Sequence, residues 1–123
     1  MVKLGTARIK KLALEWVSKY TTYMELPSSF ELLGITIHIN LTDERQDVWG
    51  EWDSESRTIL INSKATKENQ CITFMHELIH AIDDLLGLDL EHRDVYAVSQ
   101  VLWAVLRNNP SINAWINTTL SKC

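Results

Sequence analysis

The stretch from Cys71 to Asp84 constrains this chain most, because it contains the run His76-Glu77-Leu78-Ile79-His80. Two histidines four residues apart on a helix lie one turn apart on the same face, so both imidazoles can bind one metal ion. Glu77 is rotated away from that ion and can take a proton from water without being a ligand. The motif therefore predicts a helix that carries two metal ligands and a general base.

The flanks of the motif favour a helix that packs against a hydrophobic core. Apolar residues recur at helical spacing on both sides of the histidines: Ile72, Met75, Leu78, Ile79, Ile82, Leu85 and Leu86. Gly87 follows the last of them and is the residue type that most often ends a helix. Upstream, Ser63 and Thr66 are candidates for its N-cap.

Composition narrows the class of protein. A chain of 123 residues with 46% hydrophobic and 23% charged residues is ordinary for one globular domain, here residues 1–123. The net charge of −4 does not favour nucleic acid as the main partner. The apolar runs are all shorter than the ~20 residues of a membrane span, and the N-terminus does not resemble a signal peptide. We therefore expect a cytoplasmic protein that does not bind membranes.

The two cysteines are too few for a disulfide framework. Cys71 lies in the apolar helix, which predicts a small core residue rather than a ligand. Cys123 is the last residue, and we expect it to fray.

The residues before the motif predict a helix and a small sheet. Residues from about 6 to 24 have helical apolar spacing and predict a packing helix, with a basic recognition helix as the weaker alternative. Ile35 to Leu41 alternates strictly, so His38 falls on the polar face as an exposed or hydrogen-bonded residue. Val48 to Asp53 and Arg57 to Asn62 predict a hairpin, in which Gly50 marks a bulge or a close backbone approach.

The residues after the motif predict two more helices. Apolar residues continue at helical spacing from Val95 to Leu106, and Asn108-Asn109-Pro110 ends that helix. Ser111 is the candidate N-cap of a last short helix that carries Ile112, Trp115 and Ile116.

A catalytic zinc keeps three protein ligands, so the motif needs a third. From Val95 to Cys123 the chain has no Asp, Glu or His. Asp83 and Asp84 lie too far along the motif helix and are better placed as supporting or surface residues. Asp89, Glu91, His92 and Asp94 remain. A helical wheel puts Glu91 near the centre of the apolar face, whereas an imidazole is the better zinc ligand, so these residues alone leave the choice open.

Three runs of the sequence resemble a known family. His76-Glu77-Leu78-Ile79-His80-Ala81, Leu90-Glu91-His92-Arg93-Asp94-Val95 and Leu106-Arg107-Asn108-Asn109-Pro110 are similar to small zincin-like metallopeptidases of phages and prophages. These are distant relatives of the repressor-cleaving metallopeptidases of mobile elements. The resemblance covers about residues 34–110. It departs from the metzincins, which require glycine and histidine where this chain has Asp83 and Leu86.

The resemblance implies an α+β, zincin-like minimal domain: an N-terminal helix, a small antiparallel three-stranded sheet, the motif helix and covering C-terminal helices. It also implies His92 as the third ligand, so that Zn²⁺ would be held by His76, His80 and His92 with Glu77 as the catalytic base. Glutamate is the other residue common at the position of His92, and Glu91 and Asp94 stay as alternative ligands.

The implied activity is zinc-dependent hydrolysis of a peptide bond in a cytosolic protein or peptide substrate. Tyr96 is a candidate to stabilise the oxyanion, although packing on the core is the favoured interpretation of a tyrosine on this helix. The alternative function is a catalytically silent protein that binds a host or phage regulatory protein. A purely structural zinc site is disfavoured because neither cysteine is placed to close it with a fourth ligand.

Overall fold

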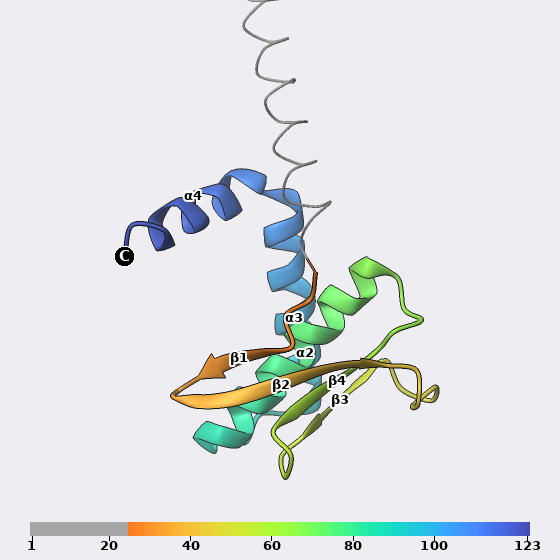
Figure 1. Cartoon of the computed structure of the whole chain (residues 1–123). Coiled ribbons are helices and arrows are strands. Elements are labelled where there is room, and N and C mark those ends of the chain that lie inside the picture. Colours follow the sequence, from red (N-terminus) through yellow and green to blue (C-terminus); the bar gives the residue numbers. More distant parts are fainter. Residues whose placement is uncertain (1–24) are drawn as a thin grey trace, which may run out of the picture.

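The computed structural model describes residues 25–123, in which a four-stranded sheet is covered on one face by helix α2 (Figure 1). The elements are β1 (Ser29–Leu32), β2 (Ile35–Thr42), β3 (Gly50–Asp53), β4 (Thr58–Asn62), α2 (Lys67–Leu86), α3 (His92–Asn108) and α4 (Pro110–Leu120). The helix expected over about residues 6–24 lies outside the described residues. The chain is therefore a mixed α+β domain, as predicted.

The predicted sheet of three antiparallel strands is wrong. The sheet has four strands in the order β1-β2-β4-β3, and β2 and β4 are parallel. The additional strand, β1, has only four residues and follows Pro27, so it offers little alternation to detect. It pairs with β2 through a two-residue turn, in which Leu33 and Gly34 have φ values of 53° and 77°.

The core lies between the sheet and α2. Ile37 of β2 and Ile59 and Ile61 of β4 are at most 1% exposed. Residues that pack against these three come from the sheet and from α2: Phe30, Leu32, Ile35, Ile39, Trp52, Phe74, Leu78 and Leu85. The alternation predicted for Ile35 to Leu41 is confirmed at its centre, since Ile37 is buried and His38 is exposed.

Helix α2 begins after one of the two predicted N-cap candidates and ends at Gly87, as predicted. Thr66 is the N-cap, and its side chain accepts a hydrogen bond from the backbone N–H of Asn69 at 3.2 Å. Gly87 closes the helix in the left-handed region at φ 62°, and its N–H donates to the carbonyl of Asp83. These caps fix the length of α2 and therefore the place at which the chain turns back toward the histidine pair.

Helix α3 packs against α2, and polar contacts join the start of α2 to the second half of α3. Glu68 of α2 accepts a hydrogen bond from the indole of Trp103 at 3.3 Å and pairs with Arg107 at 2.9 Å. These contacts join the start of α2 to the second half of α3. The two helices therefore run in opposite directions, with the start of α3 beside the later part of α2.

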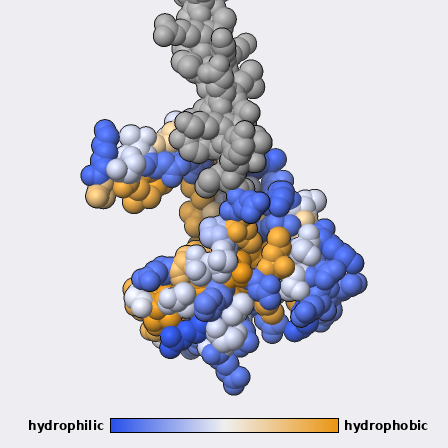
Figure 2. All heavy atoms as spheres, in the orientation of Figure 1, coloured by the Kyte–Doolittle hydropathy of each residue, from blue (hydrophilic) through white to orange (hydrophobic). Residues whose placement is uncertain are grey.

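Helix α4 does not cover the core as expected. Among the described elements it contacts only α3, and Figure 1 shows it projecting away from the sheet. It begins at Pro110 rather than after Ser111, because proline fits the first helical position without losing a hydrogen bond. Figure 2 shows apolar side chains along one side of α4, where Ile112, Trp115, Ile116 and Leu120 are exposed.

Gly50, at the start of β3, lies in close contact with α2. A Cβ at this position would lie 2.7 Å from the carbonyl oxygen of Leu60 and still closer to the methyl group of Thr73. It would also lie 3.4 Å from Cγ of Glu77. The predicted close backbone approach is therefore confirmed, and it brings β3 against the motif glutamate.

We expect Gly50→Ala to lower the free energy of unfolding by at least about 2 kcal/mol, because the new methyl group has no space. Gly87→Ala is the control, since it meets no atom within 4 Å and only strains a backbone at φ 62°, at a cost of about 1 kcal/mol. Urea unfolding measures both. Adding Thr73→Ser to Gly50→Ala should restore part of the loss, and wild-type stability in Gly50→Ala alone would contradict the packing described.

Candidate metal centre and active-site cleft

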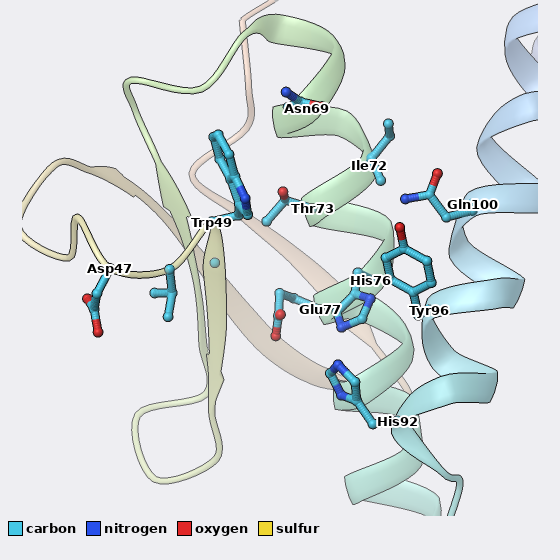
Figure 3. A pocket seen from close by; sticks show the side chains of 12 residues that line it. Asp47, Trp49, Asn69, Ile72, Thr73, His76, Glu77, His92, Tyr96 and Gln100 are labelled. Atoms are coloured by element: carbon cyan, nitrogen blue, oxygen red, sulfur yellow. The ribbon is translucent and has the colours of Figure 1, made fainter.

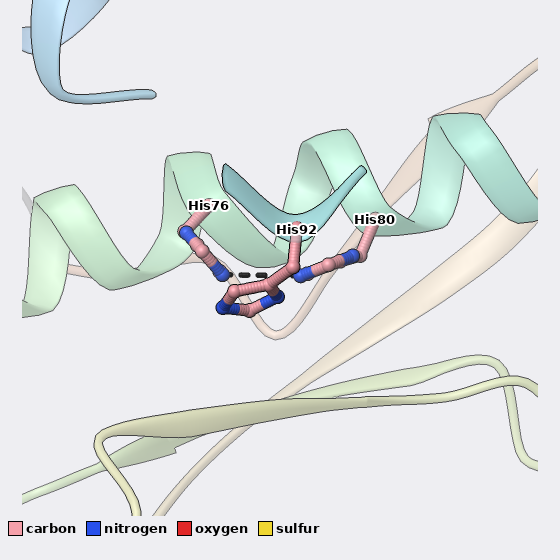
Figure 4. Close-up of side chains that lie close together, drawn as sticks. All are labelled: His76, His80 and His92. Atoms are coloured by element: carbon pink, nitrogen blue, oxygen red, sulfur yellow. Dashed lines mark hydrogen bonds between the residues drawn. The ribbon is translucent and has the colours of Figure 1, made fainter. Parts of the chain in front are cut away.

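Three histidines converge at the start of α3. His76 and His80 come from successive turns of α2, and His92 is the first residue of α3. One ring nitrogen from each can be chosen so that all three atoms lie within 4.8 Å of one another. Figure 4 shows the three rings turned toward a common point. The Nε2 atoms of His76 and His80 are 3.0 Å apart, close to the roughly 3.3 Å between two nitrogen ligands of a tetrahedral zinc.

The loop between the helices selects His92 over its neighbours. The backbone N–H of Leu90 donates to Asp83 at 3.1 Å, which folds the chain back directly after Gly87. Glu91 is the N-cap residue of α3 and not part of its regular turn, so the helical wheel that favoured it does not apply. Its carboxylate faces Arg93 at 4.0 Å, as does that of Asp94 at 3.7 Å. Within residues 25–123, His92 is the residue that joins the pair.

The surroundings keep the motif imidazoles neutral. Burial, reinforced by the nearby His80 and His92, lowers the pKa of His76 to about 4. Burial also lowers the pKa of His80, with His92 adding to the effect and Asp83 opposing it. Neutral imidazole is the form that binds a metal ion, so His76 and His80 can bind one near neutral pH without first losing protons.

Glu77 is a carboxyl group in a site where charge is costly. Its side chain belongs to a residue that is only 8% exposed, packed between α2 and β3. Burial, reinforced by the nearby Glu51, raises its pKa to about 7, and a backbone hydrogen bond from Trp52 acts in the opposite direction. A pKa near 7 suits a group that accepts and later returns a proton at neutral pH.

Two hollows meet at Glu77. The first, about 540 Å³, lies between the β3 end of the sheet and the two helices and includes His76, Glu77 and His92 in its lining (Figure 3). The second, about 460 Å³, continues past His80 along β3 toward Ser54. Gly50 and Glu77 line both. A chain lying along β3 would therefore pass directly over the glutamate.

The other residues singled out in the sequence fall outside the cluster or at its rim. Cys71 is exposed, so the expected core position is wrong. Asp83 and Asp84 lie one turn beyond His80 in supporting positions, where Asp84 accepts a hydrogen bond from the indole of Trp52 at 3.1 Å. Tyr96 is 57% exposed and lines the first hollow, so it does not pack on the core.

Five residues that line the cleft were not predicted as site residues: Trp49, Asn69, Ile72, Thr73 and Gln100. Helical spacing could have found four of them. Asn69, Ile72 and Thr73 precede His76 by seven, four and three residues, and Gln100 follows His92 by eight. Nothing in the sequence indicates that Trp49 faces these helices.

A comparison with known families agrees with this site. The model of the IrrE N-terminal-like domain, Peptidase_M78, matches residues 30–92, just over half of the chain. The chain belongs to this family. The match to the IrrE N-terminal-like domain begins in β1 and ends at His92, so it spans the sheet, the motif helix and all three histidines. Neither a curated protein nor a solved structure matches the chain.

Membership of the Peptidase_M78 family suggests a peptidase-like protein, and the donor set fits a metal ion. The three histidine nitrogens lie within 4.8 Å of one another, and two of these histidines line the first hollow, which leaves room beside the cluster for water or a substrate. No helix within residues 25–123 is both long and apolar enough to cross a membrane.

Proposed function

We propose that this protein is a zinc-dependent peptidase of zincin type that hydrolyses a peptide bond in a cytosolic protein. The observation that carries the proposal is the buried Glu77 beside three converging histidines in an open cleft. A structural metal site would have no use for such a glutamate. We further propose that residues 1–123 act as one domain and that a phage or mobile element encodes it.

The residues of the site would have separate roles in metal binding, proton transfer and oxyanion stabilisation. His76, His80 and His92 would hold the zinc ion, which supplies Lewis acidity and lowers the pKa of water toward ~7. Glu77 takes the proton of the attacking water and passes it to the leaving amine. Tyr96 stays a candidate to donate a hydrogen bond to the oxyanion, from an exposed position four residues after His92.

Strand β3 supports a peptide as the substrate. It is one of the two edge strands of the sheet, so one side of its backbone is unpaired among the described strands. An extended peptide can add to such an edge through main-chain hydrogen bonds. Because the two hollows follow β3 on either side of Glu77, this pairing would lay a peptide bond across the glutamate.

We expect one zinc ion per chain after purification or after zinc titration, because the three histidines form one site. Zinc at about 100 times its Kd should raise the free energy of unfolding by about 2.7 kcal/mol, and a chelator should remove the gain. Elemental analysis and thermal unfolding measure both. His38→Ala, which removes an exposed histidine outside the cluster, is the control and should keep zinc. A chain that binds no zinc under either condition would rule out the site.

The activity itself is tested in an extract of cytosolic proteins. Zinc-loaded protein should generate new protein N-termini, identified by mass spectrometry, that are absent when the same protein is chelated. His80→Ala protein supplies the second negative sample. New termini that are equally abundant in all three samples would come from a contaminating protease and would count against the proposal.

A further inference from the structure

The residues that line the first hollow indicate which kind of substrate side chain could bind in it. Four of its twelve lining residues have apolar or aromatic side chains: Val48, Trp49, Ile72 and Tyr96. We call this hollow the Trp49 cleft. At about 540 Å³ it lies within the range of about 300–1,000 Å³ typical of ligand pockets. Apolar walls beside a few polar groups are the usual make-up of such pockets.

Trp49 is held in place although its side chain is exposed. The indole belongs to a residue that is 61% exposed. Its backbone carbonyl accepts a hydrogen bond from the N–H of Asn62 at 2.9 Å, and the side-chain amide of Asn62 donates to the carbonyl of Val48 at 3.3 Å. The end of β4 therefore fixes the backbone that presents this ring, so a ligand that packs on the ring need not first order the backbone that carries it.

Polar but uncharged side chains complete the lining. Asn69, Thr73 and Gln100 face the cleft, and in the described part of the chain none of their side chains forms a hydrogen bond (Figure 3). Amide and hydroxyl groups of this kind can bond to the backbone of a peptide. They can do so whatever the sequence of that peptide, so the selectivity would come from the apolar walls.

The charges around the cleft argue against a charged side chain. Asp47 lies at its edge but already pairs with Arg45 at 3.0 Å. Glu77 is the other acidic residue of the lining and has the proposed catalytic role. A charged group in the cleft would lose hydration without gaining a free partner. The second hollow differs, because it is lined by Glu51, Asp83 and Asp84.

We propose that the Trp49 cleft is the specificity subsite of the enzyme and takes a bulky uncharged side chain, aromatic or branched aliphatic, from the residue beside the scissile bond. The inference rests on the proposed peptidase function and adds the substrate class. The side chain packs between Trp49 and Ile72, against Tyr96, while the neighbouring peptide groups bond to the polar lining.

Hydroxamates provide a test that does not depend on cleavage, because the hydroxamate group binds zinc directly. The probes are acetohydroxamate and two peptide series, with the variable residue on one side of the hydroxamate or on the other. The variable residue is Phe, Leu, Ala, Glu or Lys. Only the series that places its variable residue in the cleft should discriminate. In that series, calorimetry on zinc-loaded protein should show the Phe and Leu probes binding roughly tenfold more tightly than the Ala, Glu and Lys probes.

Trp49→Ala should remove most of the preference for Phe, a loss of roughly tenfold, while acetohydroxamate binding is unchanged. Trp115→Ala is the matched control, because Trp115 is 66% exposed on α4 outside the cleft. Equal affinities for all side chains, or equal losses in the two variants, would overturn the subsite while the metal centre stands. Failure of zinc-loaded protein to bind acetohydroxamate would overturn the metal centre and the subsite together.

Discussion

Glu77→Gln is expected to lower the rate of peptide cleavage at least ~10²-fold, while the protein keeps its zinc and its fold. Glutamine has nearly the same size and shape as glutamate but cannot accept the proton. The side chain is not one of the three converging ligands, so metal content should not change. The measurement is the cleavage rate of a substrate found in the extract experiment, together with zinc content and circular dichroism of the same sample.

His80→Ala should fail in a different way. It removes a direct ligand, so zinc content, thermal stability and cleavage should all fall. Glu55→Gln, in the exposed turn after β3, is the control for removing a carboxylate and should behave like the wild type.

The pair of variants also separates a catalyst from a binding protein. A silent protein that acts by occupying a regulatory partner would keep its effect in Glu77→Gln and lose it only when the fold is disturbed. Full activity of Glu77→Gln would therefore end the peptidase proposal and leave a metal-binding member of the family.

Removal of zinc should make the stability of the protein depend on pH through Glu77. The pKa of this group is about 7 in the folded chain and 4.5 as its ordinary value. Between these values the folded state holds a proton that the unfolded state releases, so the free energy of unfolding falls as pH rises through this window. The full effect of such a shift is about 3 kcal/mol.

Metal-free Glu77→Gln has no carboxyl group at this position, so it does not lose stability through ionisation of Glu77 as pH rises. Its free energy of unfolding relative to metal-free wild type should therefore rise by as much as about 3 kcal/mol between about pH 4 and about pH 8. The lowered pKa of His76 acts in the opposite sense, since its stabilisation is lost as pH falls from 6.5 toward about 4. That contribution is common to both proteins and cancels in the difference. Urea unfolding of both proteins at the two pH values measures the difference between their free energies of unfolding. If that difference does not change with pH, the burial of Glu77 is contradicted.

The sequence could predict those features that depend on the spacing of nearby residues. The apolar spacing around the two histidines and the terminal Gly87 predicted the motif helix, with Thr66 as one of two candidate caps. Alternation predicted the buried side of β2. The parallel pairing of β2 with β4 was missed, because it joins residues about twenty apart through a connection that contains another strand. The Trp49 cleft was missed for the same reason, since its apolar side chains come from the segment just before β3 and from two helices that meet only in the folded chain.

The histidines and the glutamate depend on different parts of the chain. All three proposed ligands lie between residues 76 and 92 and are brought together by two adjacent helices and one short loop. Glu77 acquires its raised pKa from burial against β3, which Gly50 allows to approach, and from the nearby charge of Glu51 on the same strand. A partly folded state with α2 and α3 paired but the sheet unformed could therefore hold the metal ion while leaving its glutamate hydrated and fully ionised. Capture of the ion would then precede formation of the reactive centre during folding.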